Sequence, residues 1–244
     1  MRPLVLCVFL MLRVACSLRA GALNTNTRFL RGGTRSLLNS VGASLGGSEA
    51  APATASTRKP IILLDVDGVI NMFENIYVPV EKREWAGDTH KTSAYNPERD
   101  MEYQLVYSKE MVRSINAWNK VAEVQWLTTW CEAAQTYVTP ALGLEHFGCA
   151  RTYKQLKDLD EEDKAKTATR IAKDVGDDTL IIWIDDEMSR FIYRSEDEDL
   201  AIFKRPNTLL IAPTGLLTRA NINLVNACVA DPLMWSGKHL REDC

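Results

Sequence analysis

The sequence predicts an α/β fold, a Rossmann-like three-layer sandwich around a mainly parallel central sheet. Three short apolar runs are typical of strands that are buried on both faces, and they cover residues 60–66, 124–127 and 179–184. Segments whose apolar residues recur at helical spacing alternate with these runs. Since 46% of the 244 residues are apolar, the chain can build one large core.

The remaining elements are expected from capping residues, apolar spacing and turn residues. Strands are expected at 103–107, 147–150 and 209–212, and helices after Ser108, at 132–138 with an end near Pro140, at 160–174, and after Thr218. The segment 71–107 is long for a connection in a compact domain. We expect it to form a small flap insert over the site, in place of a large cap domain.

Polar side chains stand where each of the three apolar runs ends. They are Asp65 and Asp67 at the end of the first run, Thr128 after the second, and Asp185 and Asp186 after the third. Because the carboxyl ends of parallel strands meet at one edge of a sheet, these side chains are expected to converge on one crevice. Two acids as close as Asp65 and Asp67 repel each other unless a cation lies between them, which predicts Mg²⁺-dependent chemistry.

In their order along the chain these residues resemble the four motifs of the haloacid dehalogenase-like (HAD) superfamily. The matching positions are Asp65-x-Asp67, Thr128, Lys166 and Asp185-Asp186. A closer likeness is to small HAD domains associated with RNA-repair proteins, in the segments 126–130, 166–167 and 183–187. The resemblance covers about residues 60–230, and it implies a Mg²⁺-dependent phosphatase with a HAD-like core.

The resemblance and the needs of phosphoryl transfer together imply a role for each residue. Asp65 would attack phosphorus, and Asp67 would act first as general acid and then as general base. Thr128 would donate its hydroxyl to a phosphoryl oxygen, and Lys166 would neutralise charge around Asp65. The Mg²⁺ ligands would be Asp65, the main-chain carbonyl of Asp67, and Asp185 with help from Asp186. A second carboxylate at Asp67 favours a phosphatase or phosphotransferase over a dehalogenase or a transport ATPase.

Neighbouring residues offer alternatives for three of these positions. Thr129 is the other hydroxyl at its strand end, and neighbours on a strand point to opposite faces. Lys164 lies two residues before Lys166, which would then be an ordinary solvated helix lysine. Asp186 and Glu187 could instead cap the segment that follows them.

The size of the flap and the distribution of charge bear on the substrate. A site without a large cap stays open, which suits a phosphorylated small molecule or the end of a polymer, such as a nucleic-acid end. Residues 60–244 carry 21 basic and 31 acidic residues, so their charge does not support extended nucleic-acid binding.

Two other functions stay open. One is a phosphotransferase that uses the same site. The other is a non-catalytic binding protein or secreted effector with the same fold, and residues 28–31 resemble the Arg-x-Leu-Arg host-entry signal of some effectors. The sequence does not indicate an oligomeric state.

The first 59 residues are expected to be a targeting region. A basic start, an apolar run and small residues at 20–22 predict a secretory signal peptide over 1–22. Residues 23–59 are basic and rich in Ser, Thr, Ala and Gly, which predicts a disordered targeting or linker segment. The expected route is secretion or onward import into an organelle such as a plastid, without stable membrane association after processing; mitochondrial import is the alternative. The catalytic domain is then expected at 60–232, followed by a C-terminal tail at 233–244.

Overall fold

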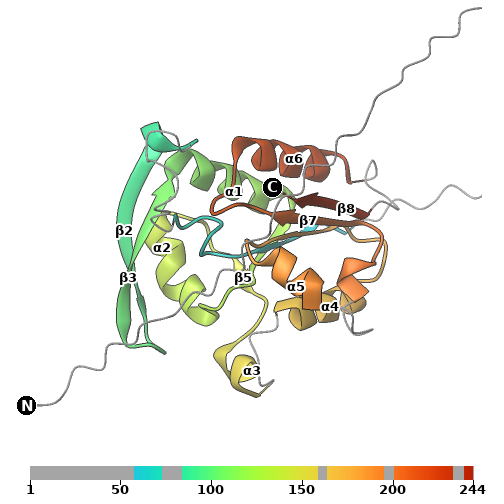
Figure 1. Ribbon diagram of the computed structural model, residues 1–244, viewed down its shortest axis with the longest axis horizontal. Helices are drawn as coiled ribbons and strands as arrows, with labels where there is room; N and C mark the ends of the chain where they lie inside the picture. Colours follow the sequence, from blue (N-terminus) through green and yellow to red (C-terminus); the bar gives the residue numbers. More distant parts are fainter. Residues whose placement is uncertain (1–57, 73–83, 159–163, 195–200, 233–238, 244) are drawn as a thin grey trace, which may run out of the picture. The chain divides into compact units, whose positions relative to one another are not determined.

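Helices and strands alternate along the computed structural model (Figure 1), which describes residues 58–72, 84–158, 164–194, 201–232 and 239–243. All of them belong to one compact unit, residues 52–244. The expected signal peptide at 1–22 and the basic segment up to residue 57 lie outside the described residues. Within the described part of the chain, no helix combines the length and apolar character needed to cross a bilayer.

The central sheet has six strands, and all neighbouring strands pair in parallel. Its strands are β1 (Ile61–Leu64), β4 (Glu123–Trp126), β5 (Gly148–Cys149), β6 (Ile181–Ile184), β7 (Thr208–Ala212) and β8 (His239–Asp243). In space they follow the order β5-β4-β1-β6-β7-β8. The chain therefore builds the sheet outward from β1 in one direction, then returns to β6 and builds it in the other. Parallel sheets with such a change of direction bind ligands there, at the carboxyl ends of the strands.

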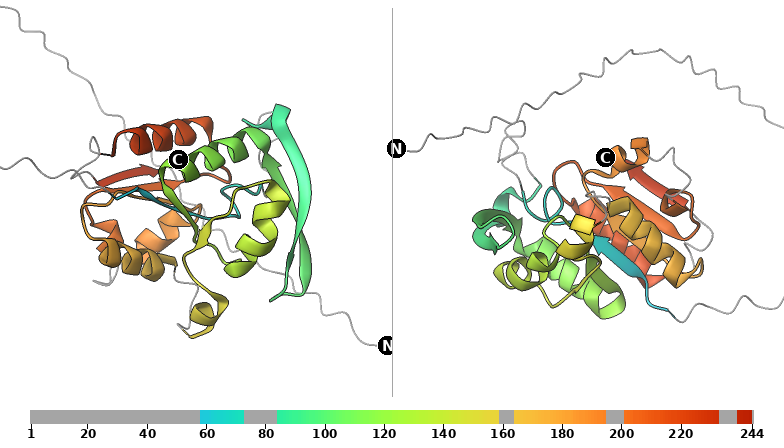
Figure 2. Two further views of the ribbon diagram at one scale, coloured as in Figure 1. Left: turned by 180° about the vertical axis from the view of Figure 1, so that it is seen from behind. Right: turned by 90° about the horizontal axis from the view of Figure 1, so that it is seen from below.

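Helices cover both faces of this sheet, which gives three layers (Figures 1 and 2). The helices α1 (Lys109–Val121) and α6 (Arg219–Ala230) lie on one face, and α4 (Lys164–Val175) and α5 (Met188–Arg194) lie on the other. Alternate residues of β1 point to opposite faces of the sheet. Ile62 and Leu64 pack into the hydrophobic core on one face, and Ile61 and Leu63 pack into the core on the other. The prediction of an α/β fold with a mainly parallel sheet is confirmed.

Local signals explain where the longer helices begin and end. The hydroxyl of Ser108 caps α1 by accepting a bond from the Met111 N–H (3.1 Å). Thr218 and Asn221 form a reciprocal capping box at the start of α6. Gly176 ends α4 in the left-handed region, with a φ of 75°.

The helix expected to end near Pro140 continues to Leu142. A π-helical turn, η3 (Ala134–Val138), leads directly into α2 (Thr139–Leu142). Pro140 is the second residue of α2 and lies inside this continuous helical segment. The expected end was therefore too early.

Other elements were not expected from the sequence. They are the helices α3 (Tyr153–Asp158) and α5, the short 3₁₀ turns η2 (Ala86–Asp88) and η4 (Ala201–Phe203), and the strand β8. Strand β8 lies within the segment 233–244 that was expected to be a tail, and it pairs with β7 along its whole length. The expected acidic loop at 195–199 lies outside the described residues.

A separate β-hairpin lies beside the carboxyl edge of the sheet. Its strands β2 (Thr89–Asn96) and β3 (Met101–Ser108) pair antiparallel, and β3 runs directly into α1 (Figure 1). The loop after β1 is joined to this hairpin by a bond from the Met72 N–H to the Val106 carbonyl (2.7 Å). Residues 73–83 of the expected flap lie outside the described residues.

Candidate functional site

Strand pairing brings together the carboxylates that follow β1 and β6. Leu64 and Ile184 are register partners at the ends of these strands, so Asp65 and Asp185 are neighbours at the edge of the sheet. The Asp65 N–H extends the pairing by donating to the Ile184 carbonyl (3.1 Å). Asp65 is only 4% exposed, and Asp185 is completely buried. The core of the protein therefore fixes the positions of both acids.

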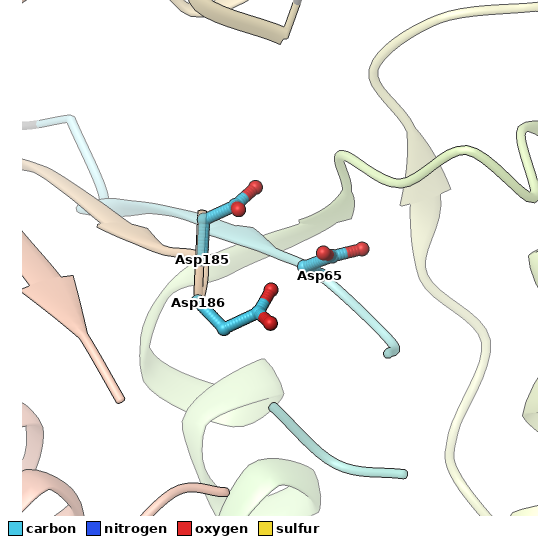
Figure 3. A group of neighbouring side chains, drawn as sticks. All are labelled: Asp65, Asp185 and Asp186. Carbon is cyan, nitrogen blue, oxygen red and sulfur yellow. The ribbon is translucent and has the colours of Figure 1, made fainter. Parts of the chain in front are cut away.

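Asp186 completes a group of three carboxylates with Asp65 and Asp185 (Figure 3). One ligand oxygen from each residue lies within 4.8 Å of the other two. Asp186 is only partly buried, so the group can be reached from solvent. Clustered carboxylate oxygens are the ligands that hard divalent cations take in proteins, and the group could therefore hold a metal ion.

A buried lysine neutralises part of this charge. The Nζ atom of Lys164 donates to Oδ2 of Asp65 (2.5 Å) and to Oδ2 of Asp185 (2.8 Å). Lys166, which was predicted for this position, is exposed. A separation of two residues along a helix corresponds to a rotation of about 200°, so Lys164 and Lys166 lie on opposite sides of α4. The structure therefore places Lys164, the alternative, and not Lys166 against the two acids, and the catalytic role of either lysine stays a prediction.

The sequence contains a pattern that favours Lys164 over Lys166. The buried face of α4 contains Ala168, Ile171 and Ala172, and Lys164 precedes Ala168 by four residues on that same face. A lysine in register with the apolar residues of a helix must either be buried or find a charged partner. Lys164 does both.

One ammonium group does not balance three carboxylates. Burial, followed by the charge of Asp65, raises the pKa of Asp185 well above its ordinary value. The same two causes raise the pKa of Asp186 to about 7. Burial alone would lower the pKa of Lys164, but the two carboxylates that it contacts raise it. When all three carboxyls are ionised, the group has an excess of negative charge, which a bound divalent cation would offset.

Gly68 lets the chain turn closely past these acids. Its φ is 74°, a left-handed conformation that favours glycine, and the turn is closed by a bond from the Asn71 N–H to the Val66 carbonyl (2.8 Å). A Cβ on Gly68 would lie within 3.0 Å of three side-chain atoms of Asp186. A side chain at position 68 would therefore displace Asp186.

The carboxylate of Asp67 is held apart from the group of three. Its Oδ1 accepts a bond from Asn71 Nδ2, and its Oδ2 accepts one from Trp130 Nε1, each at 2.8 Å. Burial raises the pKa of Asp67, although both of these bonds oppose the shift. A carboxyl group with a raised pKa is better able to hold a proton near neutral pH, which general acid catalysis requires. No side-chain oxygen of Asp67 joins the carboxylate group, and its main-chain carbonyl stays a predicted ligand.

Asn71 and Trp130 were not singled out as site residues from the sequence. Asn71 is 4% exposed and Trp130 is also 4% exposed. An asparagine four residues after Asp67, and a tryptophan directly after two threonines, were the available signals. That both residues bond to Asp67 could be learned only from the fold.

The two threonines after β4 have different surroundings. Thr128 is 1% exposed, and its hydroxyl accepts a bond from the Trp130 N–H (3.3 Å). Thr129 is half-buried and lines a pocket of about 260 Å³ together with Asp67. The structure therefore places Thr129, and not Thr128, in the wall of that pocket. Thr128 lies beside Asp65 along the sheet edge, because the preceding Leu127 N–H donates to the Leu64 carbonyl (2.9 Å); its contact with a phosphoryl oxygen stays a prediction.

No model of a protein family, no curated protein and no solved structure matches this chain. The chemistry of the site therefore follows from its own groups: three clustered carboxylates, a buried ammonium group, and a fourth carboxylate held beside a pocket.

Proposed function

We propose that this protein is a Mg²⁺-dependent phosphatase that hydrolyses phosphate esters through an aspartyl-phosphate intermediate on Asp65. The observation that carries the proposal is the convergence of Asp65, Asp185, Asp186 and Lys164 at the sheet edge. A fold that buries Asp65 and Asp185 around one lysine, with a third acid beside them, accepts a large electrostatic cost, and such costs are concentrated at functional sites. The resemblance to the HAD superfamily points to the same chemistry and to a HAD-like core.

Asp65, Asp185 and Asp186 would hold the Mg²⁺ ion, with the main-chain carbonyl of Asp67 as a further ligand. When bound, the ion would stabilise negative charge that develops on the phosphoryl group. Mg²⁺ suits an all-oxygen donor set of this kind, and it commonly binds proteins through only a few carboxylates.

The side chains supply the nucleophile and the proton transfers. In the first step an oxygen of Asp65 forms a bond to phosphorus while the bond from phosphorus to the ester oxygen breaks. The departing oxygen takes a proton from Asp67. In the second step Asp67 removes a proton from water, the water oxygen bonds to phosphorus, and the carboxylate of Asp65 is released.

Lys164 would act on the first of these steps. Its ammonium group bonds to Asp65, and the position lets it offset the charge that gathers when a phosphoryl group approaches a carboxylate. Its bond to Asp185 also fixes that acid for metal binding. A hydroxyl from Thr128 or Thr129 would contact the phosphoryl group.

The first experiment is an activity screen of the purified chain with Mg²⁺. The panel contains nucleotides, end-phosphorylated RNA and DNA, phosphopeptides, sugar phosphates and p-nitrophenyl phosphate. We expect phosphate release from at least one substrate, complete loss of release with Asp65→Asn, and unchanged circular dichroism in that variant. Incubation with labelled substrate should leave a label on the wild-type protein that hydroxylamine removes, since hydroxylamine cleaves acyl phosphates.

The same screen separates the alternatives. Appearance of phosphate on an added alcohol, in competition with water, would identify a phosphotransferase. Failure to bind Mg²⁺ in calorimetry, together with no turnover, would contradict the enzyme and favour a binding or effector protein.

We also propose that the N-terminal segment directs the chain into the secretory pathway, with mitochondrial import as the alternative. Residues 1–59 contain eight Lys or Arg and a single acid, which supports a targeting role. Microscopy of the full-length chain with a C-terminal fluorescent tag tests the proposed address.

A further inference from the structure

A pocket of about 260 Å³ lies between the β2–β3 hairpin and the residues that follow β1 and β4. Asp67 stands in its wall, and no carboxylate of the Asp65 group does. If Asp67 protonates the departing oxygen, that oxygen must lie within hydrogen-bond reach of Asp67. The part of the substrate attached to it would then occupy this pocket, which we name the Asp67 pocket.

The lining of the Asp67 pocket combines aromatic rings with hydrogen-bonding groups. Tyr103 and Trp130 meet edge to face, with ring centroids 5.3 Å apart at an angle of 71°. Met72 adds apolar surface, while Gln104 and Arg99 bring an amide and a guanidinium group. Such a lining offers both a surface for the face of a planar ring and partners for polar atoms on the edge of that ring.

These features distinguish among the common classes of phosphate ester. A nucleobase has a planar face and a polar edge, and it can use both parts of the lining. The ring of a phosphotyrosine has a face without polar edge atoms, and a sugar or glycerol has no planar face. The volume is near the lower end for small-molecule sites, so it suits one nucleoside and not a longer stretch of polymer.

The carboxyl group of Asp67 is fixed in the pocket wall through both of its oxygens. Asn71 Nδ2 and Trp130 Nε1 are donors only, so neither can take the proton that Asp67 carries. Each carboxyl oxygen keeps a second lone pair for that proton. The two bonds therefore orient Asp67 without competing for the proton that it must deliver.

The same two residues connect Asp67 to the hairpin. Asn71 Oδ1 accepts a bond from the Val106 N–H on β3 (2.9 Å), and the ring of Trp130 packs against Tyr103 on β3. Both positioning contacts of the general acid thus depend on the hairpin strand that also lines the pocket. A ligand seated against β3 would contact the element that orients Asp67.

We propose that the Asp67 pocket is the subsite for the departing group, that this group is a nucleoside, and that Trp130 and Asn71 position Asp67 to protonate it. This inference rests on the proposed phosphatase. The bond from phosphorus to the nucleoside oxygen breaks, the proton moves from Asp67 to that oxygen, and phosphorus stays on Asp65. The products of the first step are a neutral nucleoside and the aspartyl phosphate.

The test for the substrate class uses the full chain with Mg²⁺ and three substrates: adenosine 5′-monophosphate, glycerol phosphate and p-nitrophenyl phosphate. We expect kcat/KM for the nucleotide to exceed that for glycerol phosphate by about tenfold or more, which is about 1.4 kcal/mol of added binding. Gln104→Ala and Arg99→Ala, both at exposed positions, should raise KM for the nucleotide and leave glycerol phosphate unaffected. Equal values for the nucleotide and glycerol phosphate, or equal effects of both variants on the two substrates, would overturn the nucleoside assignment.

The test for positioning uses Trp130→Phe, which keeps an aromatic ring against Tyr103 and removes the N–H donor. Protonation matters for a nucleoside oxygen but little for p-nitrophenolate, which departs readily as an anion. The hydrolysis of the aspartyl phosphate is common to both substrates, so the comparison uses kcat/KM, which reports the first step. We expect kcat/KM for the nucleotide to fall by about tenfold or more and kcat/KM for p-nitrophenyl phosphate to change by less than about threefold. A parallel loss of kcat/KM on both substrates would show a merely structural role and overturn the positioning. Absence of all hydrolysis in the wild type, p-nitrophenyl phosphate included, would instead overturn the phosphatase itself.

Discussion

Gly68 lies directly against the carboxylate of Asp186, at a distance that leaves no space for a Cβ atom. The contact joins the turn after β1 to the acidic end of β6, two segments that are far apart in the sequence. Gly68 thus does two things at once: its positive φ forms the turn, and its missing side chain lets Asp186 approach Asp65.

Substitution of Gly68 should therefore weaken metal binding more than it weakens the fold. In Gly68→Ala, we expect the left-handed backbone to cost about 1–2 kcal/mol of unfolding free energy, and the displaced Asp186 to lower Mg²⁺ affinity by about tenfold. Calorimetric Mg²⁺ titration and thermal unfolding measure the two effects. Gly143→Ala is the matched control, because Gly143 has a φ of 71° but open space around its Cβ position. An equal loss of Mg²⁺ affinity in both variants would contradict the role of the Asp186 contact.

Replacement of Lys164 should affect both activity and stability. Lys164→Met leaves Asp65 and Asp185 buried without their ammonium partner, a change that costs about 3–5 kcal/mol for a buried ion pair. Phosphate release should be lost, and Mg²⁺ should restore part of the melting temperature because it replaces positive charge. Lys166→Met is the control, and it should retain phosphate release because Lys166 lies on the exposed side of α4. Loss of activity in Lys166→Met, with activity retained in Lys164→Met, would assign the catalytic role to Lys166.

The raised pKa values of Asp185 and Asp186 predict how stability depends on pH. The ordinary pKa of these carboxyls is 3.8, and burial and Asp65 raise that of Asp186 to about 7. Between these values the folded, metal-free protein holds protons that the unfolded chain has released, so its unfolding free energy should fall as pH rises. Mg²⁺ competes with these protons, so the stabilisation by Mg²⁺ should grow over the same range.

Thermal unfolding with and without Mg²⁺, from about pH 4 to about pH 8, measures this dependence. In Asp186→Asn the growth of the Mg²⁺ effect with pH should be smaller. A Mg²⁺ effect of constant size across the range would mean that these carboxyls are ionised throughout.

Asp88 provides a prediction outside the site. Its Oδ2 accepts bonds from the Glu110 N–H and the Ser108 hydroxyl, each at 2.7 Å, at the start of α1. The main-chain bond, then the hydroxyl, lower the pKa of Asp88 to about 2. Stability from this group should be present above about pH 4 and lost as pH falls toward 2.

In Asp88→Asn we expect a loss of about 1 kcal/mol in the free energy of unfolding near neutral pH, as for the loss of a helix cap. Urea unfolding of the two proteins should converge as pH falls below about 4. Mg²⁺ affinity should not change. A difference that persists at low pH would assign the effect to something other than the charge of Asp88.

The sequence predicted those parts of the fold that depend on local pattern. The apolar runs located β1, β4 and β6, and Ser108 marked the start of α1. The sequence did not predict features that depend on a partner far away in the chain. Strand β8 has the polar sequence His-Leu-Arg-Glu-Asp. No apolar pattern marks this segment as a strand, and only its pairing with β7 in the fold identifies it.

The same contrast between local patterns and distant partners holds for the candidate site. The convergence of Asp65, Asp185 and Asp186 followed from parallel strand ends alone. The partners of Asp67 did not. Trp130 is 63 residues away, and Asn71, although only four residues from Asp67, also bonds to Val106 on β3, 35 residues further on. Lys164 could have been found, since it shares the buried face of α4 with Ala168.

Asp65 and Asp67 are only two residues apart, yet their supports belong to different cores. Lys164 precedes Ala165 on α4, in one core, while Trp130 belongs to the other. In the proposed phosphatase, mutations in the hairpin would accordingly change which alcohol is released and leave the surroundings of Asp65 intact. Such an enzyme would acquire new specificities by exchanging one small insertion, without rebuilding the centre that cleaves the ester.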